Sequence, residues 1–124
     1  MPTKTSIAEV APYAGPHEIP GVRFRAVRPA LGVSAWGMNV LELDPNCSGY
    51  PEHDHTEDGQ EEVYLVLEGR ATLQVGEDAI EAGVGDLIRV EPELTRKWVT
   101  GDEGVRLLAL GGTPGKAYGD GALE

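Results

Sequence analysis

Residues 53–69 read HDHTEDGQEEVYLVLEG and carry most of the information about the fold. The stretch joins two histidines, His53 and His55, to an acidic turn and then to the most apolar run of the chain, which ends at Gly69. A short apolar run bounded by turn residues is typical of a buried β-strand. The stretch therefore predicts a loop rich in possible ligands that leads into a core strand.

Similar short runs lie on both sides of this stretch, each bounded by turn-forming residues. They predict strands at residues 22–27, 33–43, 62–67, 70–75, 79–82, 87–90, 97–100 and 105–110. Residues 29–32 and the pair Glu68-Gly69 are predicted to be turns. No segment has the helical period that crossover helices need. The predicted fold class is therefore all-β, a closed barrel or a double-sheet jelly roll.

The composition limits the classes of function. A chain of 124 residues, 40% of them hydrophobic, predicts one domain with one modest core. The formal net charge of −11 disfavours nucleic acid and anionic membrane surfaces as partners. The sequence shows neither a transmembrane run nor a signal-peptide pattern, and its single cysteine, Cys47, fits a reducing compartment. A cytoplasmic protein is expected.

The two ends of the chain differ from its middle. Residues 1–21 are rich in Pro and Gly with little periodicity, which predicts an irregular N-terminal arm that lies over the domain or a partner. Residues 111–124, GGTPGKAYGDGALE, predict a loosely held, Gly-rich C-terminal tail. The β-barrel itself is expected at residues 22–110.

The two histidines of the opening stretch are candidate metal ligands. Residues i and i+2 of an extended segment lie on the same side, about 6.5–7 Å apart, so His53 and His55 can converge on one ion. Glu62 at the start of the next strand adds a carboxylate. The alternative is that both histidines are partly exposed residues of an acidic loop.

Together with Gly69, these residues resemble the first motif of the cupin superfamily: Gly, five residues, His-x-His, three or four residues, Glu, six residues, Gly. The resemblance covers residues 33–110 and implies a small single-domain cupin with a double-stranded β-helix, or jelly-roll barrel. It further implies that His53, His55 and Glu62 bind a divalent transition metal, one of Fe, Mn, Ni, Zn, Co or Cu, inside the barrel. A homodimer is also implied by the resemblance.

The match to this motif has two departures. Three residues separate Gly49 from the first histidine, and six separate the second histidine from Glu62. The inserted residues leave Gln60, Glu61 and Glu62 open as the third ligand, and the distance to Gly69 favours Glu62. Gln60 shares its strand face and is predicted as a weaker ligand or as a hydrogen-bond partner of a ligand.

The second cupin motif is matched poorly, and Arg96 stands where the family has a fourth ligand, a histidine. A guanidinium stays protonated and cannot bind a metal. One interpretation is a three-ligand site with open positions, in which Arg96 clamps an anionic group of a substrate. The other is a structural ion pair between Arg96 and Glu62 in a barrel without metal.

Three functions follow, because a fold alone does not specify a reaction. The first is a metal-binding protein for a small, anionic molecule, with oxygenase or isomerase activity as its catalytic form. The others are a non-catalytic small-molecule-binding or sensing barrel and a metal-free structural barrel. Tyr64 is expected in the core or on a pocket wall. His17 is expected to be a solvated loop residue, the alternative being a ligand supplied by the arm.

Overall fold

The computed structural model describes residues 1–118. The elements in chain order are the 3-10 helix η1 (Ile7–Glu9), strand β1 (Val22–Ala26), helix α1 (Val27–Leu31), and strands β2 (Gly37–Leu43), β3 (Glu61–Val75), β4 (Asp78–Gly83), β5 (Leu87–Val90), β6 (Arg96–Val99) and β7 (Val105–Gly112). The strand pairs are antiparallel. The predicted all-β jelly-roll barrel is confirmed.

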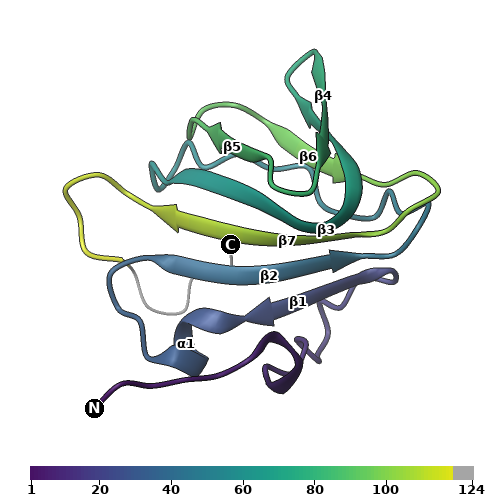
Figure 1. Cartoon of the computed structure of the whole chain (residues 1–124). Coiled ribbons are helices and arrows are strands. Elements are labelled where there is room, and N and C mark those ends of the chain that lie inside the picture. The colour runs from purple at the N-terminus through teal and green to yellow at the C-terminus, as the bar shows by residue number, and fades with distance from the viewer. Residues whose placement is uncertain (119–124) are drawn as a thin grey trace.

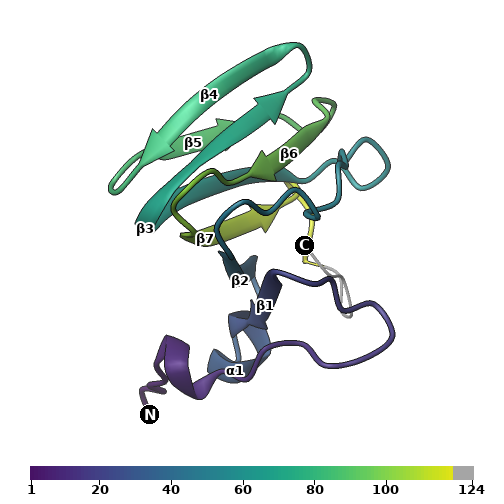
Figure 2. The same ribbon diagram turned by 90° about the vertical axis from the view of Figure 1, so that its right-hand side faces the viewer.

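Strand β3 connects the two layers of the barrel. Its first half pairs with β5 and β7, and its second half pairs with β4 and β6. Strand β7 continues the sheet through β2 to β1. In Figures 1 and 2, β1, β2 and β7 form one layer, and β4, β5 and β6 lie together on the other side of β3.

The middle of β3 corrects one prediction. The register of β3 on β7 shifts between Val66 and Glu68, and Gly69 has a φ of 76°, a left-handed value that favours glycine. A Cβ at Gly69 would collide with the carbonyl oxygen of Gly104. Glu68-Gly69 therefore lies inside one 15-residue strand, directly after a β-bulge at Leu67, and is not a turn between two strands. A positive φ suits both, so the sequence pattern did not separate them.

A short helix occupies the region predicted as a turn, and β2 begins later than predicted. Helix α1 ends at Gly32, whose N–H donates to the carbonyls of Arg28 at 3.0 Å and Pro29 at 3.2 Å. A proline is tolerated there because the first turn of a helix leaves its N–H groups without partners in any case. Strand β2 then starts at Gly37, four residues after the start predicted from the apolar pattern.

The interior face of the barrel is formed by alternate residues of the strands. Glu62 lies on the same face of β3 as the buried residues Tyr64 and Val66. Its neighbours in the register are Gly111 on β7 and, beyond it, Gly37 on β2. Neither of these two positions places a side chain beside Glu62.

The N-terminal arm lies along β1 (Figure 2). Pro12 forms a β-bridge with Arg25, and Ile19 forms one with Val22. The Arg25 guanidinium also donates to the carbonyl of Val10 at 2.7 Å. The loop between the two bridges is thus held at both ends by β1. The predicted limits of the arm, the barrel and the tail stay predictions.

Part of the expected tail is ordered structure. Residues 111 and 112 extend β7, and Tyr118 is buried with the Arg28 guanidinium 4.7 Å from its ring centroid. Residues 119–124, the rest of the expected tail, lie outside the described residues. Within residues 1–118, no helix is long and apolar enough to cross a membrane.

Candidate metal centre

Backbone pairing positions both histidines. His53 forms an isolated β-bridge with Arg96, in which each N–H donates to the other's carbonyl, at 3.1 and 2.9 Å. The N–H of His55 donates to the carbonyl of Pro92 at 2.8 Å. The segment before β3 is therefore extended where the i, i+2 argument needs it, and both side chains lie beside Glu62 on β3.

The structure brings His53, His55 and Glu62 together. One ligand atom from each lies within 4.8 Å of the others. Oε1 of Glu62 is 3.8 Å from Nε2 of His53 and 3.4 Å from Nε2 of His55. The side chains of His55 and Glu62 are 8% and 2% exposed, whereas that of His53 is 25% exposed. The group is buried on one side and opens toward solvent at His53.

The contacts of the two Nδ1 atoms orient both imidazole rings so that their Nε2 atoms face the Glu62 carboxylate. Nδ1 of His53 lies 3.1 Å from the carbonyl oxygen of Pro51, and Nδ1 of His55 lies 3.1 Å from a carboxylate oxygen of Asp58. These oxygens are acceptors, so each Nδ1 carries a proton, and in the neutral imidazole each Nε2 presents a lone pair. Both Nε2 atoms are buried and have no hydrogen-bond partner. Two orphaned lone pairs beside a carboxylate fit a divalent transition metal.

The Glu62 carboxylate is ionised although it is buried. Burial by itself raises the pKa of Glu62. Interactions with His53, His55 and Tyr64 lower it by a larger amount, so that the pKa of Glu62 lies well below its ordinary value. The Tyr64 hydroxyl donates to Oε1 at 2.8 Å. Burial and the nearby Tyr50 and Glu62 raise the pKa of Tyr64 well above its ordinary value. Tyr64 is thus a neutral donor that orients the carboxylate.

Arg96 is fully buried behind Glu62. Its Nη1 lies 3.7 Å from Oε1 of Glu62, which is an ion pair but longer than a hydrogen bond, and its Nη2 donates to the carbonyl of Glu91 at 2.8 Å. The Nε and Nη1 atoms have no hydrogen-bond partner. The guanidinium is therefore beside Glu62, and its role stays a prediction.

The two other candidates for the third ligand lie elsewhere. Glu61 is on the outer face of β3 and accepts a hydrogen bond from Arg89 at 2.9 Å. Gln60 is buried, and its Nε2 donates to Asp58 at 3.0 Å. Asp58 in turn contacts His55, and the pKa of His55 is raised by Glu62 first and by Asp58 second, against the effect of burial. Gln60 therefore contacts Asp58, which contacts His55.

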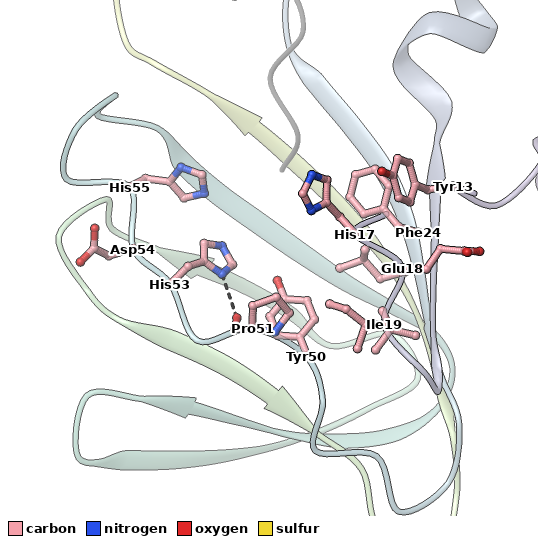
Figure 3. A pocket seen from close by; sticks show the side chains of 12 residues that line it. Tyr13, His17, Glu18, Ile19, Phe24, Tyr50, Pro51, His53, Asp54 and His55 are labelled. Carbon is pink, nitrogen blue, oxygen red and sulfur yellow. Dashed lines mark hydrogen bonds between the residues drawn. The ribbon is translucent and has the colours of Figure 1, made fainter. Parts of the chain in front are cut away.

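A cavity of about 400 Å³ adjoins the histidines, a size within the range of small-molecule sites. It is lined by Tyr13, His17, Glu18, Ile19, Val22, Phe24, Leu41, Tyr50, Pro51, His53, Asp54 and His55. Figure 3 shows His17 from the arm on the opposite side of the cavity from His53 and His55. Arg96, Glu62 and Tyr64 are not among the described residues of this lining.

Two residues of the site were not identified from the sequence. His17 is exposed, as expected of a loop residue, but it faces the cavity. Its position depends on where the arm crosses β1, which the predicted arm left open. Asp58 was grouped with the acidic turn, and its contact with His55 follows from that turn, in which the N–H of Gly59 donates to the His55 carbonyl at 2.8 Å. The i, i+3 spacing was the available signal.

Comparisons with solved structures show the same fold. The chain is similar to a cupin protein from Bacteroides fragilis, with 20% identity over 99% of this chain and 97% of that chain and a TM-score of 0.73. It is also similar to a sugar phosphate isomerase of the cupin superfamily from Silicibacter pomeroyi, with 21% identity, coverage of 94% and 82%, and a TM-score of 0.73. A third similar structure is a polyketide cyclase from Streptomyces resistomycificus, with 20% identity over 100% of this chain and 89% of that chain and a TM-score of 0.74.

A search of curated protein sequences found no match. The sequence model of the Cupin domain matches residues 39–111, which is more than half of the chain and contains the candidate ligands. The chain therefore belongs to the cupin family.

Proposed function

We propose that this cupin binds a divalent transition metal through His53, His55 and Glu62 and presents it to a small molecule in the adjoining cavity. The observation that supports this most is the pair of buried Nε2 atoms, which have no hydrogen-bond partner and lie beside an ionised carboxylate. Buried polar atoms without partners are rare in proteins, and a bound ion is a common reason for them.

The chain's own residues prepare this group. Asp58 and the Pro51 carbonyl hold the two imidazoles with their lone pairs toward Glu62, while Tyr64 holds the carboxylate. A metal bound there would act as a Lewis acid toward an oxygen donor. Two histidines and one carboxylate suit Fe, Mn, Ni, Zn, Co or Cu and leave room for that donor. An oxygenase or isomerase reaction is the catalytic form of this proposal.

The anionic group proposed from the sequence belongs at the metal end of the small molecule. A carboxylate or enolate oxygen is favoured there by the charge of the metal. Arg96 is fully buried and does not line the cavity, so we assign it to holding Glu62 from behind. The homodimer and the cytoplasmic location stay predictions.

The metal-free structural barrel is the second candidate, favoured by the 3.7 Å contact between Arg96 and Glu62. Elemental analysis of protein purified without a histidine tag or chelator separates the two. The metal proposal expects about one equivalent per chain, lost in His53→Ala and kept in the matched variant His17→Ala. Less than about a tenth of an equivalent, unchanged by His53→Ala, would support the structural barrel instead.

A further inference from the structure

Arg96 places a fixed positive charge inside the candidate metal centre. Its side chain is 0% exposed, and its Nη1 lies 3.7 Å from Oε1 of Glu62. The Nε2 atoms of His53 and His55 lie 3.8 and 3.4 Å from the same oxygen. The guanidinium is therefore about as close to this oxygen as the two imidazoles are. Because a guanidinium stays protonated, its charge is permanent.

Strand β6 and its neighbours hold the guanidinium in this place. The backbone of Arg96 is fixed by the two hydrogen bonds of its bridge to His53. Its Nη2 donates to the Glu91 carbonyl at 2.8 Å, whereas its Nη1 has no hydrogen-bond partner. Trp98, two residues along β6, is fully buried and packs edge-on against Tyr64. The guanidinium is thus fixed beside Glu62 without being hydrogen-bonded to it.

Glu62 and Arg96 balance each other's charge when no ion is bound. Within residues 1–118, Glu62 is the sole carboxylate that forms an ion pair with Arg96. Two buried charges of opposite sign compensate each other, and removal of one leaves the other buried without a partner. Metal binding at Glu62 adds a second positive charge beside the same oxygen. The guanidinium therefore opposes metal binding by electrostatic repulsion.

We propose, building on the metal site of the proposed function, that Arg96 is an internal counter-charge that stabilises the empty centre and lowers its affinity for the metal. A bidentate arginine–carboxylate pair occupies both carboxylate oxygens. The 3.7 Å contact instead compensates the charge of Glu62 and leaves Oε1 with one hydrogen bond, from Tyr64. Arg96 and the metal are thus alternative partners of one carboxylate. Removal of the arginine charge has opposite effects on the stability of the empty chain and on its metal affinity.

Zinc affinity of the full chain, measured at one pH by competition with a chromophoric chelator, tests the second effect. Arg96→Met removes the charge and keeps an unbranched side chain. We expect it to bind zinc about tenfold more tightly than wild type, the effect of one charge at this range even with the screening of water. Arg96→Lys keeps the charge and should stay within about threefold of wild type.

Urea unfolding of the same chains tests the first effect. Metal-free Arg96→Met should unfold at a lower urea concentration than wild type, because Glu62 is left as an uncompensated buried charge. The same excess of zinc should raise its midpoint more than that of wild type. Arg25→Met is the control, because Arg25 is only 15% exposed but pairs with Glu42 on the outer face. It should lower the stability and leave the zinc affinity unchanged.

The outcomes separate this inference from the metal proposal. A zinc affinity of Arg96→Met equal to or below that of wild type overturns the inference and leaves the metal site standing. Zinc binding by Arg96→Met but not by wild type supports the inference and overturns the proposed function, and no binding by either chain overturns both. If Arg96→Met does not fold without metal, refolding with zinc decides: recovery supports the counter-charge, and no recovery while Arg96→Lys folds overturns it.

Discussion

Two buried carboxylates lie on opposite faces of the barrel wall, and their surroundings differ. Glu42 on β2 points outward, and its carboxylate accepts hydrogen bonds from the Nε atoms of Arg23 at 3.1 Å, Arg25 at 2.9 Å and Arg106 at 2.8 Å. Glu62 on β3 points inward. Both carboxylates are almost fully buried, at 7% and 2% side-chain exposure. Only the first has its charge fully paired by close hydrogen bonds.

The inward carboxylate has looser partners. Glu62 accepts one short hydrogen bond, from Tyr64, and its distances to the nitrogens of His53, His55 and Arg96 are 3.4 to 3.8 Å. Those three nitrogens have no hydrogen-bond partner. A saturated cluster, in which the hydrogen bonds of the carboxylate are made, stabilises the folded chain. An unsaturated cluster, in which they are missing, can still bind a ligand. The comparison therefore separates a structural carboxylate from a binding one.

The largest expected effect is on stability at the saturated cluster. Glu42→Ala leaves three arginines without their shared partner and should lower the free energy of unfolding by about 3 kcal/mol, the low end for a broken buried pair because Arg23 is 43% exposed. Urea unfolding measures the change. Glu68→Ala, at the exposed partner of Arg106, should cost less than about 0.5 kcal/mol. Equal losses would show that the Glu42 cluster stabilises the fold no more than an exposed ion pair does.

The second expected effect is on metal affinity at the unsaturated cluster. Asp58→Ala removes the group that orients His55 and should weaken metal binding about tenfold, or about 1.4 kcal/mol, measured by competition with a chromophoric chelator. Asp58 is 48% exposed, so the stability should change by less than about 0.5 kcal/mol. Asp44→Ala is the control, because Asp44 is similarly exposed but pairs with Arg23. An equal fall in affinity there would contradict the assignment.

The third expected effect is a loss of stability at low pH. It should be smaller than the loss caused by Glu42→Ala, because protonation leaves the Glu42 side chain in place. Burial raises the pKa of Glu42, but Arg25, Arg106 and Arg23 lower it more, so its pKa in the folded chain lies below its ordinary value. The stabilisation is present above the unfolded-state pKa of about 4.5 and is lost as the pH falls through the folded-state value.

Comparison of wild type with Glu42→Gln measures that pH effect. The difference in the free energy of unfolding between the two should be constant from pH ~7 to pH ~5 and should shrink below pH ~4.5. A difference that stays constant down to pH ~3 would show that the charge of Glu42 does not contribute. Urea titrations at each pH give the required values.

Most of the fold could be predicted because its signals are local. Apolar runs between turn residues located β1, β4, β5, β6, β7 and the two halves of β3, and the spacing from the histidine pair to Gly69 was sufficient to indicate the barrel. The continuation of β3 through Gly69 was not predicted, because it depends on how closely β3 approaches Gly104. The five-residue helix after β1 was also missed, since a segment so short has no periodicity to detect.

By itself, the sequence determined the all-β class, the cupin resemblance and the three ligand types, since these depend on residue identity and on spacing along the chain. Only the tertiary structure decided which carboxylate stands beside the two histidines, because Glu61 and Glu62 differ only in strand face. It also decided that Arg96 lies behind Glu62 and that His17 reaches the cavity. These are contacts between segments far apart in the sequence, and they arise when the strands pair and the arm crosses β1.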